Sequence, residues 1–360
     1  MNKWLASPVL LMIGAHIALA QTSVSIYGIA DGGFVHESGG VAGSVTKLTS
    51  GVGSASRLGF RGAEDLGSGM SAIFALETGY RIDTGEVDTA GTIFNRQAFV
   101  GLKTNAGTLT LGRQYTPWHQ ALVQVADPFG TGFAGGAKNL FPDWSTNVRI
   151  SNTIVYAAPS VAGVSADIAY TAGEQAGSNA AGRQFGASLG YSRGPLDVRL
   201  AYNNKNSDVA PAPGIAAVSR TIGTNTLLAA NYNFGVAKAY FAYGMDKGFN
   251  SAPMGNNNNP YGGVKPTPST DSNEVLLGVA APLGHGRLLA SYTRKNDKTS
   301  QNQDAHAWGI GYLYALSKRT DLYAVYGAIV NSNGAGYTVA NNSEAGTGNR
   351  ASNLGIRHTF

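Results

Sequence analysis

Apolar and polar residues alternate along most of this chain with a period of two, which is typical of β-strands and not of amphipathic helices. Near residue 60, for example, Leu58 and Phe60 share one face, whereas Arg57 and Arg61 share the other. Many alternating segments reach the length of about 9–11 residues that a tilted transmembrane strand needs. The segments are 24–34, 56–64, 70–80, 95–103, 108–114, 152–158, 164–171, 184–193, 196–204, 224–234, 238–246, 274–282, 286–294, 305–315, 320–331 and 350–360.

Short turns and long polar loops alternate between these segments. The short turns are 65–69, 104–107, 159–163, 194–195, 235–237, 283–285 and 316–319. The long loops are 35–55, 81–94, 115–151, 172–183, 205–223, 247–273, 295–304 and 332–349. Outer-membrane barrels have short periplasmic turns and long external loops. A soluble β-sandwich also has many strands and turns, but it has no reason to gather every long loop at one end.

A sheet that crosses a membrane must close on itself, because an unpaired backbone group in hydrocarbon costs several kcal/mol. The last segment, 350–360, is therefore expected to pair with the first. One of its faces carries Leu354, Ile356 and Phe360, with His358 as the polar exception. The sequence predicts an all-β fold, a 16-stranded antiparallel transmembrane β-barrel.

The first 20 residues are typical of a signal peptide. Lys3 is their only charge, an apolar stretch follows at 9–19, and Ala18-Leu19-Ala20 forms a small-residue cleavage site. A buried core helix or a membrane anchor is the alternative, but the stretch is too short to span a bilayer. We expect a signal peptide at 1–20 and a barrel domain at 21–360.

The composition fits a protein whose outer face meets lipid. The chain has no cysteine, only 13% charged residues and more Tyr (17) than Phe (13). Several tyrosines fall near predicted strand ends, where they suit aromatic girdles at the lipid–water interface, although Tyr also simply favours strands. These are Tyr27, Tyr80, Tyr170, Tyr191, Tyr232, Tyr243, Tyr312 and Tyr326.

Three motifs resemble those of the general bacterial porins, the trimeric 16-stranded family of the β-proteobacteria. They are the first strand at 24–31, the strand and turn at 57–67, and the strand pair at 95–103 and 111–114. The terminal Phe360 resembles the family's assembly signal. The resemblance implies that the third loop, 115–151, folds inward and narrows the lumen; the alternative is an external loop like the others. It also implies a water-filled channel in the outer membrane for small polar solutes and ions.

The resemblance further implies charged walls at the narrow part of the pore. Arg57, Arg96 and Arg149 match pore-wall arginines, and Arg61 falls at a further basic position. Asp127, with Asp143 as the weaker candidate, would oppose them from the loop, and Glu77 matches an acidic wall position. An arginine facing lipid near the midplane would cost about 2–4 kcal/mol, which independently favours the lumen or an interface for Arg57 and Arg61. Ile29 departs from a position that is basic in some relatives. A formal charge of +5, one less without Lys3, and these arginines lead to the hypothesis of modest anion preference.

No catalytic set, metal-ligand spacing, cofactor motif or nucleic-acid fold is evident in the sequence. A substrate-specific channel stays open as a rival, because Trp118, Phe129, Phe133 and Trp144 could line the loop. A barrel enzyme and an adhesin acting through its loops are two further rivals. The expected partners are two further copies in a homotrimer, outer-membrane lipid and lipopolysaccharide, and the barrel assembly machinery. In the trimer, loop 81–94 would latch onto a neighbour through Asp83, Glu86 and Asp88.

Overall fold

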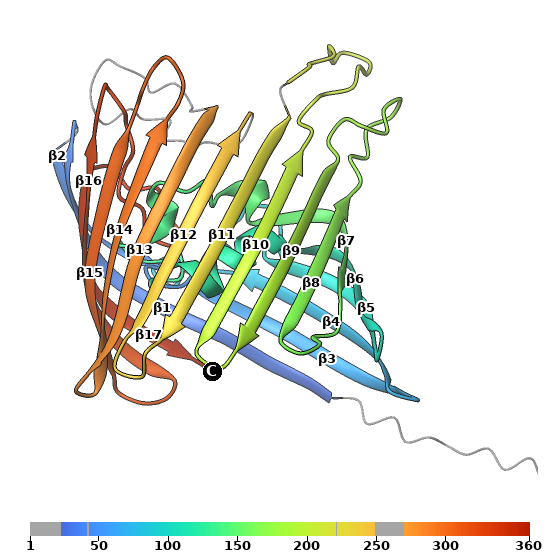
Figure 1. Cartoon of the computed structure of the whole chain (residues 1–360), viewed down its shortest axis with the longest axis horizontal. Helices are drawn as coiled ribbons and strands as arrows, with labels where there is room; N and C mark the ends of the chain where they lie inside the picture. The colour runs from blue at the N-terminus through green and yellow to red at the C-terminus, as the bar shows by residue number, and fades with distance from the viewer. Residues whose placement is uncertain (1–22, 42, 221, 249–269) are drawn as a thin grey trace, which may run out of the picture.

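The computed structural model is a tilted barrel of strands whose longest loops lie at one end and whose short turns lie at the other (Figure 1). It describes residues 23–41, 43–220, 222–248 and 270–360. The predicted signal peptide, 1–20, and the asparagine run at 256–259 lie outside the described residues. The described residues form one antiparallel sheet of seventeen strands.

The strands follow one another along the chain and each pairs with its neighbours. Their bounds are β1 (Ser23–Gly40), β2 (Gly43–Ser50), β3 (Arg57–Gly67), β4 (Met70–Gly79), β5 (Gln97–Thr104), β6 (Gly107–Tyr115), β7 (Arg149–Ala157), β8 (Val164–Thr171), β9 (Gln184–Arg193), β10 (Leu196–Lys205), β11 (Gly223–Asn233), β12 (Lys238–Lys247), β13 (Asp271–Leu283), β14 (Gly286–Asp297), β15 (Ala305–Ala315), β16 (Thr320–Asn331) and β17 (Arg350–Thr359).

The barrel closes through β1 and β17, as the sequence predicts. Their register runs from Ile29 opposite Thr359 to Ser38 opposite Arg350. The last residue continues the ladder, since Gly28 N–H donates to the Phe360 carbonyl at 3.0 Å and Phe360 N–H donates to the Gly28 carbonyl at 3.1 Å. Closure leaves no open sheet edge to face the lipid.

The prediction of a long first loop at 35–55 is wrong, because β1 runs on to Gly40 and β2 returns from Gly43. One edge of β1 pairs with β2 over its outer part and with β3 over its first residues. The described β2 and β3 therefore share one position around the barrel, which makes it a closed 16-stranded barrel. Val45, Thr46 and Thr49 explain the extension, because β-branched residues favour strands.

The outer face of the barrel is apolar and its inner face packs against loops. Leu354 and Ile356 on β17, for example, are 60% and 48% exposed on the outside. Most of the predicted girdle tyrosines lie on this face, but Tyr27 does not. Its hydroxyl points inward and donates to Glu77 Oε2 at 3.0 Å, so β-propensity and not an interface explains this tyrosine.

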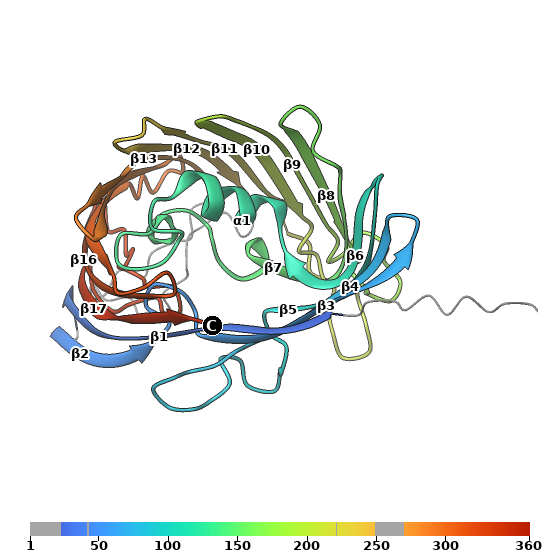
Figure 2. The same ribbon diagram turned by 90° about the horizontal axis from the view of Figure 1, so that it is seen from below.

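The third loop, between β6 and β7, fills part of the barrel interior, which confirms the prediction that it folds inward (Figure 2). It contains the α-helix α1 (Pro117–Ala121), the π-helical turn η1 (Leu122–Ala126) and the 3-10 turns η2 (Ala137–Asn139) and η3 (Ser145–Asn147). None of the described helices is long and apolar enough to cross a membrane.

The last long loop, 332–349, also turns inward, where the sequence predicts an external loop. Ala335, Val339 and Ala340 are buried. Ala340 N–H donates to Asn139 Oδ1 of the third loop at 2.8 Å. Two loops therefore meet inside the barrel and shape its passage.

Candidate functional site

The third loop is held to one side of the lumen by an apolar face. Thr116 caps α1, with its hydroxyl oxygen accepting from His119 N–H at 3.0 Å, and Pro117 follows at the first helical position. Trp118, Leu122 and Phe141 are completely buried in a cluster with lumen-facing residues of β10–β13. These wall residues are Ala201, Leu227, Ala229, Ala242 and Leu276. The loop leaves its other face toward β3–β7.

The tip of the loop is folded around Asp127. Its carboxylate accepts backbone N–H bonds from Phe129 at 2.9 Å, from Thr131 at 2.8 Å and from Ala137 at 2.7 Å. Only 4% of Asp127 is exposed. Burial raises the pKa of its carboxyl to about 6, although the three N–H groups favour the charged form. Asp127 therefore organises the loop from within.

Glycines let the loop tip lie directly on the barrel wall. A Cβ added to Gly309 of β15 would stand 2.3 Å from the Cα of Gly135 in the loop. No side chain fits at that approach, so a glycine at this wall position allows backbone to touch backbone. Phe129 and Phe133 beside it are buried in a cluster with Tyr323 and Val325.

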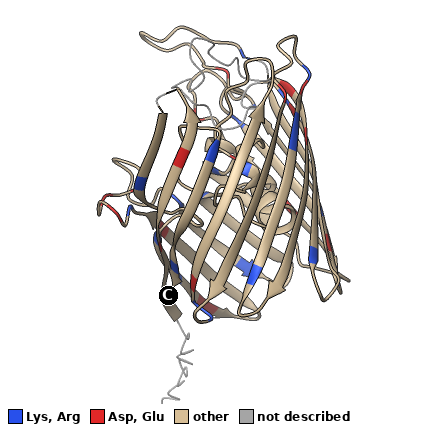
Figure 3. Cartoon of the chain, turned by 90° about the vertical axis from the view of Figure 1, so that its left-hand side faces the viewer, with Lys and Arg blue, Asp and Glu red and all other residues tan. Residues whose placement is uncertain are grey.

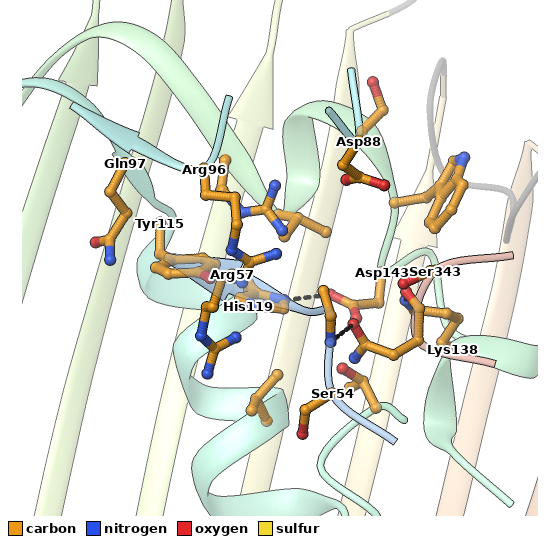
Figure 4. A pocket seen from close by; sticks show the side chains of 18 of the residues that line it. Ser54, Arg57, Asp88, Arg96, Gln97, Tyr115, His119, Lys138, Asp143 and Ser343 are labelled. Atoms are coloured by element: carbon orange, nitrogen blue, oxygen red, sulfur yellow. Dashed lines mark hydrogen bonds and ion pairs between the residues drawn. The ribbon is translucent and has the colours of Figure 1, made fainter. Parts of the chain in front are cut away.

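Four arginines line the wall opposite the loop. Arg57 begins β3, Arg96 precedes β5, Arg113 lies on β6 and Arg149 begins β7. Arg113 is held by two bonds, from Nε to the Asn95 carbonyl at 2.6 Å and from Nη1 to Ser151 Oγ at 3.0 Å. Figure 4 shows Arg57 and Arg96 beside the ring of Tyr115.

Glu77 and Tyr115 hold these guanidinium groups together. Arg96 Nε lies 2.7 Å from Glu77 Oε1, and Arg96 Nη2 donates to the Tyr115 hydroxyl at 2.6 Å. Arg57 Nε lies 3.8 Å from Glu77 Oε2. The Arg149 guanidinium sits 5.1 Å from the centroid of the Tyr115 ring, a cation–π contact. One carboxylate therefore faces several guanidinium groups, and the cluster keeps net positive charge.

The loop adds a cation to the other side of the passage. Lys138 Nζ donates to the Asn342 carbonyl of the last loop at 2.6 Å and lies 5.0 Å from the centroid of the Trp144 ring. Burial lowers the pKa of Lys138 to about 8. Asp143 is close by, but its Oδ1 is 2.5 Å from His119 Nδ1, and His119 stacks on Tyr115 at a ring distance of 5.1 Å.

These groups surround one cavity of about 880 Å³, which the wall and the two inward loops enclose. Its lining includes the four wall arginines, Tyr115, His119, Lys138, Asp143 and Ser343, and the pair Arg81 and Asp88 from the loop 81–94. Figure 4 shows Lys138 and Ser343 across the cavity from Arg57. A passage of this kind has polar walls with fixed positive charge on both sides.

Comparisons with known proteins agree with this geometry. The family model described as Gram-negative porin matches residues 6–335. An outer membrane porin protein of Bordetella pertussis is 31% identical, with 100% of both chains covered. Outer membrane porin protein 32 of Delftia acidovorans is also 31% identical, with 99% of both chains covered. The chain belongs to the Gram-negative porin family.

Solved structures of porins share the fold. The anion-selective porin from Comamonas acidovorans has a TM-score of 0.75 and 28% identity, covering 94% of this chain and all of that one. A Vibrio cholerae outer membrane protein, solved in its trimer form, has a TM-score of 0.64 at 17% identity, covering 94% and 99%. This porin is thus an integral β-barrel of the outer membrane that forms a water-filled channel.

The structure brings together only part of the predicted constriction. Arg57, Arg96 and Arg149 meet on the cavity wall, and Glu77 lies among them. Arg61 lies further along β3, where its guanidinium is 5.1 Å from the Tyr27 ring and outside the cavity lining.

The structure places the two loop carboxylates differently. Asp127 does not line the cavity, because its carboxylate oxygens accept hydrogen bonds from backbone N–H groups inside the loop. Asp143 reaches the lining, but it is buried against His119. Sequence reasoning missed Arg113, Lys138 and Tyr115. For Arg113 a signal existed, since it lies in the motif at 111–114, whereas nothing in the sequence indicates that Lys138 points to the passage.

Proposed function

We propose that this porin passes small hydrophilic solutes with a preference for anions, and that Arg57, Arg96, Arg113, Arg149 and Lys138 set the preference. The observation that carries the proposal is the position of the charges. Cationic groups line both sides of the cavity, while the carboxylates of Asp127 and Asp143 are engaged within the loop and that of Asp88 is paired with Arg81. The sequence predicts a positive wall that faces a negative loop; the proposal instead has a passage with positive groups on both sides.

The mechanism is passive diffusion through a charged constriction. An anion that enters loses part of its hydration, and the guanidinium donors and the ammonium group of Lys138 compensate for this loss. A cation at the same place meets repulsion from both sides. Because Arg96 is anchored to Glu77 and Tyr115, the donors are held in place and need no reorganisation when an ion arrives. The name of the Comamonas relative, an anion-selective porin, supports the proposal.

The test is the zero-current potential of single channels in a planar bilayer across a KCl gradient. We expect the sign that corresponds to chloride being more permeable than potassium. A potential of the opposite sign would overturn the proposed preference and leave the channel itself in place.

A substrate-specific channel is a second candidate because aromatic rings border the cavity. Tyr115 and Trp144 line it, and each carries a cation over its face. An organic anion could exploit this arrangement. Block of chloride current by such an anion at micromolar concentration would favour this candidate, and the absence of block would favour general diffusion.

We also propose a homotrimer with loop 81–94 as the contact to a neighbour. Ile82, Val87 and Ile93 of this loop are 47%, 49% and 68% exposed, which is typical of a surface that a partner covers. The expected role for Asp88 changes, because it pairs with Arg81 of the same loop at 3.2 Å. The trimer form of the Vibrio cholerae protein supports the assembly. Gel mobility of unheated and heated protein tests it.

Two further proposals concern biogenesis. The first is that residues 1–20 are a signal peptide, which N-terminal sequencing of the protein from outer membranes would check. The second is that Phe360, which joins the closing ladder to Gly28, is the signal read by the barrel assembly machinery. Deleting Phe360 should then lower the amount of heat-modifiable barrel in the membrane.

A further inference from the structure

The loop 81–94, between β4 and β5, contributes two charged side chains to the outer margin of the main cavity. They are Arg81 and Asp88, which both line the cavity. Figure 2 shows that the loop stands out from the barrel wall, and Figure 3 shows acidic and basic positions along it. Figure 4 shows Asp88 at the edge of the cavity. Since β4 runs toward the end of the barrel that carries the long loops, a solute from outside passes this margin first.

Backbone pairing at the base of this loop brings the two side chains together. Arg81 N–H donates to the Glu86 carbonyl at 2.8 Å, and Asp88 N–H donates to the Gly79 carbonyl at 2.9 Å. Arg81 and Asp88 therefore leave the same short hairpin, and Arg81 Nε lies 3.2 Å from Asp88 Oδ1. The ion pair is thus built into the base of the loop.

Arg81 also reaches the last loop. Its Nη1 lies 3.4 Å from Glu344 Oε1, and Glu344 Oε2 lies 2.7 Å from Lys47 Nζ on β2. Lys47 Nζ in turn lies 2.8 Å from Glu37 Oε1 on β1. The side chains of Glu37, Lys47, Glu344, Arg81 and Asp88 therefore form a chain that alternates in sign, with three carboxylates against two cations.

Arg81 and Asp88 line the cavity, whereas the other three members of the chain do not. Deeper in the passage, the wall arginines and Lys138 leave the lining positive. The margin differs, because Asp88 matches the charge of Arg81, and the salt bridge to Arg81 is the one that Asp88 forms within the part of the chain that the structure describes. With Arg81 this pair has no net charge. Without Arg81 the margin would be negative and would repel an anion before the arginines could attract it.

We propose that Arg81 is a specificity-determining residue of the passage, because it neutralises Asp88 at the entrance from outside. It acts on permeating ions through the charge of the lining, which attracts or repels ions before they reach the constriction. This inference rests on the proposed anion preference and extends it to loop 81–94. The alternative is that Arg81 only fastens this loop to the last loop through Glu344, and the experiment separates the two roles.

The test is the zero-current potential at pH 7 across a gradient from about 0.1 M to about 0.01 M KCl, where the Debye length is about 10 Å or more. It compares wild type with Arg81→Gln, Arg81→Lys, Asp88→Asn and Arg81→Gln/Asp88→Asn. The matched control is Lys247→Gln. Lys247 lies 3.9 Å from Asp271 at the same end of the barrel, but it points outward, since the neighbouring Asp246 is buried on the inner face. Heat-modifiable gel mobility verifies that each variant folds and assembles.

The expected order of the variants follows from the charge that each leaves at the margin. A unit charge about 6 Å from an ion changes the local ion concentration about threefold in water. Arg81→Gln turns the neutral pair into one negative charge, so chloride should fall and potassium should rise by about this factor, and their permeability ratio should fall about tenfold. Asp88→Asn leaves Arg81 unmatched and should raise the ratio by a similar factor. Arg81→Gln/Asp88→Asn removes both charges and should recover most of the wild-type ratio. Arg81→Lys keeps the charge and should lose far less than Arg81→Gln, and Lys247→Gln should equal wild type.

A fastening role makes a different prediction, because the double variant loses the same contact to Glu344 as Arg81→Gln and should be no closer to wild type. A double variant as far from wild type as Arg81→Gln would therefore overturn the proposal. An Asp88→Asn ratio equal to that of wild type would also overturn it, and this variant decides the question if Arg81→Gln fails to assemble. A wild type that prefers potassium would overturn the proposed function instead. The order of the variants relative to that wild type would still test the role of Arg81, so the two failures are distinguishable.

Discussion

The ion preference of the pore should fall as the pH rises through about 8, because Lys138 loses its charge there. Burial lowers the pKa of this side chain to about 8 from the usual value above 10. Below that pH the ammonium group faces the wall arginines across the cavity, and above it the loop side has lost this positive charge. The direction is fixed by the sign of the charge: anion permeability decreases and cation permeability increases with pH.

The size of the effect follows from the cavity. A volume of about 880 Å³ equals that of a sphere of about 6 Å radius, so an ion at its centre lies about 6 Å from a charge on the lining. In water a unit charge at about 6 Å contributes about 0.7 kcal/mol, which changes the local ion concentration about threefold. Chloride should fall and potassium should rise by about this factor. The Debye length of about 10 Å at 0.1 M salt leaves most of the effect unscreened.

The assay is the zero-current potential across a KCl gradient at pH 6.5, 7.5, 8.5 and 9.5. Wild type should show a step centred near pH 8. Lys138→Arg is the sharpest control, since a guanidinium group stays charged over the whole range and should abolish the step without abolishing the anion preference. Lys138→Gln should have the high-pH selectivity of wild type at every pH.

A pH step in Lys138→Arg equal to that of wild type would refute the reasoning. The titrating group would then lie elsewhere in the chain. A flat profile in all three proteins, with Lys138→Gln equal to wild type, would show that the loop cation does not act on permeating ions.

Three further predictions concern the wall and the loop. Arg96→Ala should lower the ratio of chloride to potassium permeability. It should also destabilise the barrel by about 3–5 kcal/mol in thermal unfolding, because Glu77 loses its close partner in a buried site. An unchanged melting temperature would contradict this. Asp127→Asn replaces an acceptor by a donor facing a backbone N–H and should lower the stability of the folded loop by about 1–3 kcal/mol. We expect greater single-channel current noise and faster proteolysis of the loop. Unaltered noise would count against the role assigned to Asp127. Gly309→Ala should push Gly135 off the wall and change conductance, whereas a wild-type conductance would mean that the loop tip shifts at no cost.

Much of the fold could be predicted because a barrel in lipid has few options. Alternation with a period of two and the ban on open edges together require that residues near 350–360 pair with those near 24–34, as β17 and β1 do. The error at 35–55 has a physical reason. Gly39, Gly40 and Gly43 look like loop residues, but Gly39 and Gly43 supply the positive φ angles that a tight hairpin needs, so that β2 can follow β1.

The candidate site was less predictable because a carboxylate in a loop has two uses. Asp127 followed by Pro128 and glycines can face a pore or can accept N–H bonds from its own loop, and the sequence is the same in both cases. The structure shows the second use. Lys138 has the converse problem, since its approach to the passage depends on a carbonyl of Asn342, which is contributed by a loop about two hundred positions away.

Apolar residues on the far wall determine which arginines border the open passage. Alternation breaks at Leu227 and Leu228 of β11, which are apolar on both faces, because Leu227 covers the third loop while Leu228 meets lipid. The apolar lumen-facing residues lie on β10–β13, and Trp118 and Leu122 of the loop are buried against them. The loop therefore lies against this part of the wall. The open passage is thereby shifted to the opposite side, along β3 to β7. Arginines on that side border the passage for this reason, whereas an arginine elsewhere in the lumen does not.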